Sequence, residues 1–400
     1  MLSLHTTRPV RQLARFLQPA QRLARFIASA ASTNAVGPKV HCYVSRCTDP
    51  YTNLAFEDWI LRKSDPESFI LYLWRNRPTI VIGRNQNPWK ECNLRMMAER
   101  DVLLARRTSG GGAVYHDMGN TNYTVVMPRD AFTRDRCAQM VACALLNQDI
   151  PAYVNARHDV AVDGKKISGS AFKLTSKRAF HHGTMLIDTD LGRLNGVLRS
   201  KAHDEIAALG VDSVRSVVAN LRDYSWTIDH QTFCDAVMLE FSRTFGALNE
   251  NNVTVWNEGD KDVAALVDDE RSRIQTWKWL YGQTPRFVHS FDTAFSWGPV
   301  FARVTVYHGL VAEVLLSASP VADTDADIDA SAVVLPPHLR DSFDAVARAM
   351  ADAPYEAAEV HRRLESVRRA GPHAGDLCEW LVAKVGDAAS GKHMPSGDLA

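Results

Sequence analysis

The sequence predicts an α+β fold, because strand-like and helix-like segments follow one another irregularly along its 400 residues. Short runs rich in β-branched and aromatic residues indicate strands. Stretches with apolar residues at helical spacing indicate helices. Hydrophobic residues make up 46% of the chain and charged residues 23%, as in an ordinary globular protein. This composition excludes a chain that is disordered throughout, and the sequence contains no internal repeat.

The predicted elements form two groups along the chain. Strands are expected at 41–46, 68–74, 79–83, 122–127, 160–162 with 165–173 as a hairpin around Asp163-Gly164, 180–187, 302–307 and 311–317. Helices are expected at 51–63, with Thr52 or Asn53 as N-cap, and at 93–100, 131–147, 231–245, 261–281, 339–351 and 356–368. Because Gly282-Gln-Thr-Pro285 breaks the pattern, we predict a main domain over 34–282 and a smaller α+β domain over 286–390.

The N-terminal segment differs in charge from the rest. Residues 8–27 contain five arginines among apolar residues, and no acidic residue precedes Asp49. A Ser/Ala-rich stretch follows. This pattern is typical of a mitochondrial transit peptide, so we predict that residues 1–33 are removed and that the mature protein is in the mitochondrial matrix. A basic helix retained at a membrane surface is the alternative.

Charge and cysteine patterns exclude several other classes. Lys and Arg number 46, as do Asp and Glu, which argues against a nucleic-acid-binding protein. No apolar run approaches the length of about 20 residues that a membrane-spanning helix needs. None of the seven cysteines forms a Cys-x-x-Cys pair or has zinc-finger spacing with His. We therefore predict no nucleic-acid partner, no membrane partner and no metal bound by the protein itself.

A glycine-rich segment carries the strongest local signal. Gly110, Gly111 and Gly112 lie between two strand-like stretches, with Arg106 and Arg107 beside them. Glycine allows a ligand to approach the backbone, and exposed N–H groups in such a turn bind anions. The alternative is a flexible turn with a solvated basic flank. No Gly-Lys-Ser/Thr follows, so this is not a Walker A loop.

Three further segments could contact a ligand. Lys166 lies on a strand next to small residues, where it could meet an anion or simply protect a sheet edge. His181 and His182 are adjacent on a strand, so they point to opposite faces and cannot bind one metal together. Ser213-Val-Arg215-Ser offers hydroxyls and a guanidinium to a phosphate, or begins a capped helix.

Together these motifs resemble lipoate–protein ligase A and the mitochondrial lipoyltransferases, over nearly all of residues 40–320. The family implies a mixed-sheet catalytic domain of the biotin/lipoate ligase type with a small C-terminal accessory domain. The motifs that carry the resemblance are Asn53-Leu-Ala-Phe-Glu-Asp-Trp59, Val81–Asn93, Arg106–Asn120, Lys166–Ala171, His181–Thr184, Asp188–Leu191, Ser213–Ser216 and Trp277–Pro285.

The resemblance also implies a reaction and its partners. Lipoate or octanoate is joined to AMP from ATP, with Mg²⁺ on the nucleotide phosphates. The acyl group then passes to a lysine of a lipoyl domain. Such domains belong to the E2 subunits of 2-oxoacid dehydrogenases and to the H protein of glycine cleavage. We expect the enzyme to act as a monomer.

Site residues follow from the same resemblance. Lys166 is the expected catalytic cation, placed with Arg107 by the acyl phosphate. The expected lipoyl- and adenylate-binding residues are Arg107, Ser109, Gly110, Gly111, Gly112, His116, Asp159, Ser170, Ala171, His182, Thr184, Ser213 and Arg215. The chain departs from the family at Thr108 and Lys173, where arginine is common, and at His158, where asparagine is usual.

Other activities in the family's chemistry remain alternatives. A transferase would use a preformed acyl-adenylate, or an acyl-CoA or acyl-protein donor, without an activation step. The retained Ser-Val-Arg-Ser and His-His-Gly-Thr motifs favour the ligase. Transfer from a thioester through a cysteine is less favoured, because no cysteine lies between Lys166 and Cys234. A non-catalytic lipoyl-domain binder would have little reason to keep both a cation pair and a glycine loop.

Overall fold

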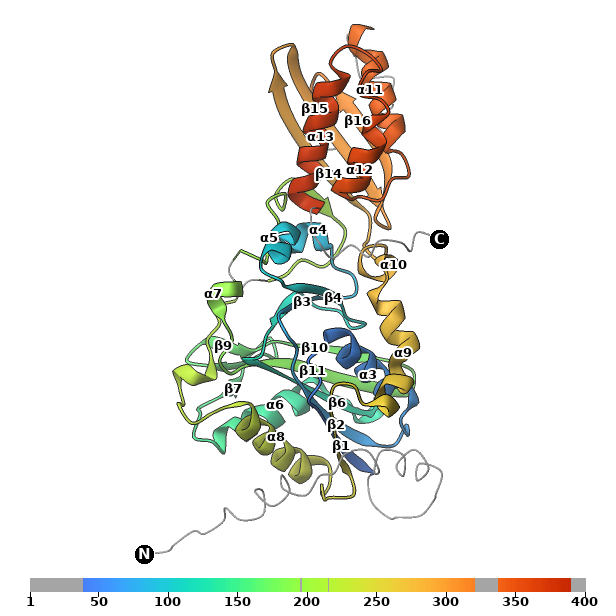
Figure 1. Cartoon of the computed structure of the whole chain (residues 1–400). Coiled ribbons are helices and arrows are strands. Elements are labelled where there is room, and N and C mark those ends of the chain that lie inside the picture. The colour runs from blue at the N-terminus through green and yellow to red at the C-terminus, as the bar shows by residue number, and fades with distance from the viewer. Residues whose placement is uncertain (1–38, 195, 215, 321–336, 390–400) are drawn as a thin grey trace, which may run out of the picture. The chain divides into compact units, whose positions relative to one another are not determined.

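The computed structural model describes residues 39–194, 196–214, 216–320 and 337–389 (Figure 1). The predicted transit peptide, residues 1–33, lies outside this range. The chain divides into two compact units, each built from several segments. Unit 1 comprises the chain up to Arg84, Ala105–Leu191 and Val214–Gln275; unit 2 comprises Asn85–Leu104, Gly192–Ser213 and the chain from Thr276 onward.

A six-stranded mixed sheet is the centre of unit 1. Its strand order is β10-β11-β6-β2-β1-β13. Strand β1 runs parallel to β2 and β13, and the other neighbours are antiparallel. All nine residues of β6 are buried, as expected for a central strand covered on both faces. The strands are β1 (Val40–Ser45), β2 (Phe69–Trp74), β6 (Asn120–Pro128), β10 (Ser170–Leu174), β11 (Arg178–Leu186) and β13 (Val253–Trp256).

Two pairs of helices cover this sheet. Helices α3 (Pro50–Lys63) and α9 (Lys261–Gln275) pack together on one side, and α6 (Arg134–Leu146) and α8 (His230–Phe245) on the other (Figure 1). The predicted cap of α3 is wrong: the Asp49 carboxylate accepts the Thr52 N–H at 2.8 Å, and Asn53 is fully buried. An aspartate at the N-cap also complements the positive end of the helix.

The predicted hairpin is correct at its turn and wrong at its far end. Asp163 and Gly164 have φ of 49° and 75°, as a two-residue hairpin turn requires. The second strand breaks at Gly169, so that its first part, β9 (Lys165–Ser168), pairs with β8 (Val160–Val162) and its second part, β10, pairs with β11. Strands β8 and β9 form a small sheet with β7 (Tyr153–Val154). Another small sheet consists of β3 (Thr79–Ile82), β4 (Leu103–Arg106) and β5 (Val114–His116).

Unit 2 combines a four-stranded antiparallel sheet with three longer helices. The strands are β12 (Ile206–Ala208), β14 (Phe287–Phe295), β15 (Gly298–Tyr307) and β16 (Leu310–Ser317). The helices are α11 (Pro337–Met350), α12 (Ala357–Glu365) and α13 (Ala374–Ala389). The sequence prediction missed β12, β14 and α13 of this unit, and β7 and β13 of unit 1. Shorter helices of the chain are α4 (Pro88–Glu91), α5 (Leu94–Glu99), α7 (Leu191–Leu194), α10 (Trp277–Leu280) and the 3₁₀ turns Arg129–Ala131 and Leu221–Asp223.

The division into units differs from the predicted boundary near residue 282. Residues 85–104 and 192–213 belong to unit 2. The buried Trp89 explains the first of these, because its ring packs against Tyr281 and Tyr355 at centroid distances of 5.4 and 5.5 Å. The predicted helix 261–281 also ends early, since the Thr276 side chain caps a separate helix, α10. No helix in the described ranges is both long and apolar enough to cross a membrane.

Candidate functional site

Arg107 holds the glycine loop, which we define as Ser109–Gly112. Its Nη2 donates to the carbonyl oxygens of Gly110 and Gly112 at 2.6 and 2.8 Å, and its Nε donates to Ser109 Oγ at 3.0 Å. Nη1 donates to the Val81 carbonyl at 2.9 Å. Burial lowers the pKa of Arg107 to about 10, so the guanidinium stays charged at neutral pH. The side chain therefore fixes the shape of the loop and places a positive charge beneath it.

Glycine is required at two positions, Gly83 and Gly111, where a side chain would lie too close to a neighbouring part of the chain. A Cβ on Gly83 would lie 2.1 Å from the Gly111 carbonyl oxygen. Gly111 itself has a φ of 90°, which side chains rarely adopt, and its Cβ would lie 3.0 Å from Arg107 Nη2. A Cβ on Gly110, by contrast, would meet nothing within 4 Å. The loop is packed tightly on one side and open on the other, as a backbone that receives a ligand requires.

Lys166 is held at its backbone and at its tip. Its N–H donates to the Val217 carbonyl at 2.9 Å, and its carbonyl accepts the Ala219 N–H at 3.1 Å. Its Nζ lies 2.8 Å from Asp159 Oδ1. A Cβ on Gly169 would lie 3.4 Å from this Nζ, so the missing side chain leaves room for the lysine. Since 24% of the Lys166 side chain remains exposed, its charge is fixed in place and still accessible.

The paired strands β10 and β11 bring the loop and the lysine to one surface. Ala171 pairs with His182, and a Cβ on Gly111 would lie 3.5 Å from the Ala171 Cβ. Thr184 and Gly169 exchange hydrogen bonds: Gly169 N–H donates to Thr184 Oγ1 at 3.1 Å, and Thr184 N–H donates to the Gly169 carbonyl at 2.9 Å. Ser170 lies between these contacts, paired with Gly183, and its hydroxyl donates to the His158 carbonyl at 3.4 Å.

A chain of hydrogen bonds runs from α3 to the glycine loop. His182 Nδ1 lies 2.8 Å from Glu57 Oε1, and Nε2 lies 2.9 Å from Ser109 Oγ. An ionised carboxylate only accepts hydrogen bonds, so Nδ1 carries the proton toward Glu57. With a proton at Nδ1, the Nε2 atom can accept the Ser109 O–H, and Ser109 Oγ accepts the Arg107 Nε–H. Thr124 also donates to Glu57, at 2.6 Å.

Glu57 belongs to the family motif Asn53–Trp59, but the sequence alone predicts no role for it. The available signal is a pair of adjacent acids, Glu57 and Asp58, within the otherwise apolar stretch Leu54–Leu61. Both are 2% exposed. Buried carboxylates are rare unless they are paired or hydrogen-bonded, so such a pair points to basic partners elsewhere in the sequence.

His116 and His181 are both buried but differ in their contacts. His116 Nδ1 accepts the Asn76 amide N–H at 3.0 Å. Burial, with Arg107 and His182 nearby, lowers the pKa of His116 to about 3. His181 packs against Tyr123, and neither of its ring nitrogens has a hydrogen-bond partner among the described residues. The two adjacent histidines 181 and 182 thus face different surroundings, as predicted.

The three residues that depart from the family pattern each contact an aspartate. Thr108 Oγ1 and Lys173 Nζ both donate a hydrogen bond to Asp58 Oδ1, at 3.3 and 2.9 Å. The two positions at which arginine is common in the family therefore meet at one carboxylate. His158 has a φ of 61° and its Nδ1 lies 2.6 Å from Asp135. Asparagine, aspartate and histidine tolerate this backbone region better than other side chains, which explains why histidine can stand there.

Ser213 is the last residue of a segment of unit 2, and Val214 begins a segment of unit 1. Gln86 Nε2 donates to Ser213 Oγ at 3.0 Å, and Glu91 accepts the Ser213 N–H at 3.3 Å. Arg215 lies outside the described residues, so the nucleotide contacts expected of both residues stay predictions. In the described parts of the chain, no three His, Cys, Asp or Glu side chains gather in a way that could hold a metal ion.

Comparisons with known proteins point to one family. The model of the lipoyl protein ligase A/B catalytic domain matches residues 49–242. Lipoate-protein ligase A of Psychrobacter cryohalolentis is 35% identical over 354 residues, which cover 87% of this chain and 99% of that protein. Lipoate-protein ligase A of Bdellovibrio bacteriovorus is 40% identical over 265 residues, 65% of this chain and 77% of that protein.

Solved structures agree. LipL1 of P. falciparum in complex with lipoate has a TM-score of 0.53 and 25% identity over 86% of this chain and 99% of its own. A chain from the archaeal lipoylation system of Thermoplasma acidophilum, a bipartite lipoate protein ligase and its E2 lipoyl domain, has a TM-score of 0.50 and 25% identity. It covers 62% of this chain and 96% of its own. The chain therefore belongs to the lipoate–protein ligase A family.

Proposed function

We propose that the chain is a lipoate–protein ligase that activates lipoate, or octanoate, with ATP and transfers the acyl group to a lysine of a lipoyl domain. In the first step a carboxylate oxygen attacks the α-phosphorus of ATP and pyrophosphate leaves. In the second step the acceptor amine attacks the acyl carbon and AMP leaves, with loss of one proton from the amine. The observation that carries the proposal is the accessible Lys166–Asp159 pair beside a glycine loop built on Arg107.

The residues have distinct roles in this chemistry. Negative charge develops on the phosphate and on the acyl oxygen in both steps. Lys166 would stabilise it from a position fixed by Asp159, which avoids the reorganisation that water requires. The open backbone at Gly110 would admit the mixed anhydride, with the charge of Arg107 behind it. Magnesium would be held by the nucleotide phosphates.

The proposed acceptors are lipoyl domains of 2-oxoacid dehydrogenase E2 subunits and the glycine cleavage H protein, and the proposed working state is a monomer. The T. acidophilum lipoylation system, in which a bipartite lipoate protein ligase has an E2 lipoyl domain as its partner, supports this class of acceptor. We also propose a matrix location, which a fusion of residues 1–33 to a fluorescent protein would test by its import into mitochondria.

The direct test of the site is Lys166→Ala, with Lys165→Ala as matched control because Lys165 is exposed on the same strand. Acyl transfer to an apo lipoyl domain should fall on the order of 10²–10³-fold in the first variant, as for loss of one preorganised donor. It should be unchanged in the second. Circular dichroism of both should match the unmutated protein. Equal activity of Lys166→Ala and the control would refute a catalytic role and favour a non-catalytic lipoyl-domain binder.

A further inference from the structure

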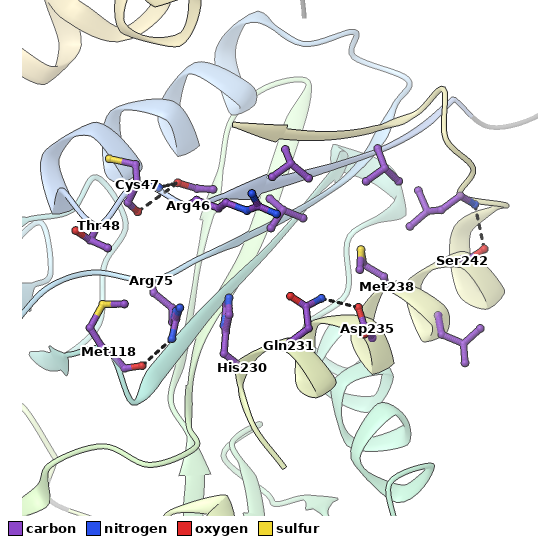
Figure 2. Close-up of a pocket in the computed structure, with 16 residues that line it drawn as sticks. Arg46, Cys47, Thr48, Arg75, Met118, His230, Gln231, Asp235, Met238 and Ser242 are labelled. Carbon is purple, nitrogen blue, oxygen red and sulfur yellow. Dashed lines mark hydrogen bonds between the residues drawn. The ribbon is translucent and has the colours of Figure 1, made fainter. Parts of the chain in front are cut away.

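A cavity of about 500 Å³ lies in unit 1 between helix α8 and strands β1 and β13 (Figure 2). None of the described residues assigned to the proposed acyl-activating site lines it. Its walls come from β1 and the segment that follows, from β13 and from α8. Its volume lies within the range of roughly 300–1,000 Å³ of small-molecule sites. The cavity is therefore large enough to be a binding site in its own right.

The lining is apolar in one part and polar in another. Val44, Val253 and Val255 of the strands form the apolar part with Met238, Leu239 and Leu248. In Figure 2 the polar residues Thr48, Arg75 and His230 lie toward one side of the close-up, and Met238 and Ser242 lie toward the other. A ligand that matches both parts must have one polar end and one apolar end.

Two arginines make the polar part cationic. Arg75 is half-buried, and among the described residues its guanidinium donates one hydrogen bond, from Nη1 to the Met118 carbonyl at 3.1 Å. Arg46 is exposed, and no described residue forms a hydrogen bond or ion pair with its guanidinium. His230 adds no charge near neutral pH, since burial and then Arg75 lower its pKa to about 4. Guanidinium groups with free N–H donors bind carboxylates in a bidentate geometry.

Asp235 is the one acid among the described residues that line the cavity. Its carboxylate accepts the Gln231 Nε2–H at 2.9 Å, and burial raises its pKa. Arg46, Arg75 and Asp235 therefore give the described lining a net charge of +1. Asp229, outside the lining, lies close enough to act on Arg75 and lowers the positive potential further. This balance suits a monoanion better than a phosphate that carries two charges.

We propose that this cavity is a second, non-catalytic site that binds a medium-chain monocarboxylate. The carboxylate lies at Arg46 and Arg75, and the alkyl chain lies against the valines, Met238 and Leu239. Each buried CH₂ adds to the favourable transfer from water, so a chain of eight to ten carbons would bind more tightly than acetate. No described lysine lines the cavity, and the acid bound there does not react. The proposal does not depend on the proposed ligase activity.

The test uses the full chain and decanoic acid with a terminal diazirine, followed by photolysis and peptide mass mapping. Label is expected on α8 (His230–Phe245) or β13 (Val253–Trp256), and unlabelled decanoate should displace it. Label on β10 or β11 would report the acyl-activating site separately. Failure of that site therefore cannot be confused with failure of this one.

Two variants and two matched controls make the assignment specific. Arg46→Glu should weaken labelling of α8 and β13 roughly tenfold by charge reversal, and Leu239→Glu, on a residue 37% exposed, should do the same at the apolar part. Lys177→Glu and Leu146→Glu, an exposed lysine and leucine that do not line the cavity, should label like the unmutated protein. Acyl transfer should be unchanged in all four.

Three results would overturn the proposal. The first is no label on α8 or β13. The second is equal labelling there in the two variants and the two controls. The third is displacement by decylamine as effective as displacement by decanoate, because the cavity would then bind any amphiphile.

Discussion

At the scale of single residues, the glycine loop depends on hydrogen bonds to Arg107 and His182. Arg107 donates to two of its carbonyls, and His182 Nε2 lies 2.9 Å from the hydroxyl oxygen of Ser109. The Glu57 carboxylate only accepts hydrogen bonds, so its contact with His182 places a proton on Nδ1. The loop is thus positioned from a helix remote in sequence. In the proposed mechanism Glu57 is a positioning residue and Lys166 the catalytic one.

Glu57→Leu tests this positioning. Leucine has no acceptor for the His182 Nδ1–H or the Thr124 O–H, and a buried donor left unsatisfied costs about 1–3 kcal/mol. We expect unfolding by urea to show a loss of that size and acyl transfer to fall about tenfold. The tautomer of His182, read by ¹⁵N NMR, should shift toward the Nε2-protonated form. Glu67→Leu, on an exposed carboxylate, is the control. An unchanged tautomer in Glu57→Leu would contradict the proposed hydrogen-bond chain.

At the scale of elements, the sequence predicted most of the main sheet and its helices within a few residues. Hydrophobic period and turn residues are local signals, and the Asp163-Gly164 turn followed from them. The break at Gly169 has no such local signal, because it depends on the Lys166 side chain, whose end packs against the backbone of Gly169. Strand β14 and the assignment of 85–104 to unit 2 also depend on contacts distant in sequence, such as the packing of Trp89 on Tyr281.

The contacts within the candidate site were also beyond what local sequence signals can predict. The glycines, Lys166 and His182 were identified from residue types and family resemblance. The partners Asp159–Lys166 were both named, but their pairing was not. Asn76 was not singled out, because an asparagine that orients a buried histidine has no local sequence signal. Its contact with His116 exists only after β3 and β5 pair.

Strand β12 is held to unit 2 by a polar network. Glu205 accepts hydrogen bonds from His289 Nε2 at 3.0 Å and from Lys384 Nζ at 2.7 Å. Tyr355 O–H then donates to His289 Nδ1, at 2.5 Å. These contacts, with His289 as the largest cause, lower the pKa of Glu205 to about 2. The stabilisation is therefore present above about pH 4.3, the ordinary value for glutamate, and is lost as pH falls toward 2.

Glu205→Gln should remove that stabilisation. Because about a third of the Glu205 side chain is exposed, we expect a loss of only about 1 kcal/mol at pH 7. The difference from the unmutated protein should shrink as pH falls from 4.3 toward 2. Urea unfolding at several pH values measures it, with the exposed Glu313→Gln in the same unit as control. A difference that does not vary with pH would show that the Glu205 charge is not the cause.

At the scale of the whole molecule, buried neutral histidines make the protein sensitive to acid. Burial lowers the pKa of His116 and His181 to about 3, and that of His41 and His230 to about 4. The unfolded chain takes up these protons near pH 6.5, whereas the folded chain does not. Stability is therefore full above pH 6.5 and falls as pH drops from 6.5 toward 3, by about 1.4 kcal/mol per pH unit for each histidine.

His181→Phe isolates one such histidine, because neither ring nitrogen of His181 has a partner to lose among the described residues. Between pH 7 and pH 5 the free energy of unfolding should fall by about 2 kcal/mol less than in the unmutated protein. His361→Phe, at an exposed position, should leave the slope unchanged. The same slope in both variants would mean that His181 is not held neutral by burial.

The central claim is that one chain both activates and transfers the acyl group. The most direct measurement is the intact mass of an apo lipoyl domain after incubation with the protein, free lipoate and magnesium ATP. Parallel reactions replace ATP and lipoate with synthetic lipoyl-adenylate, or omit the nucleotide. We predict a lipoyl mass gain with ATP and free acid, and none without nucleotide. A gain only with the preformed adenylate would contradict the activation step and make the protein a transferase. No gain in any reaction would contradict the account as a whole.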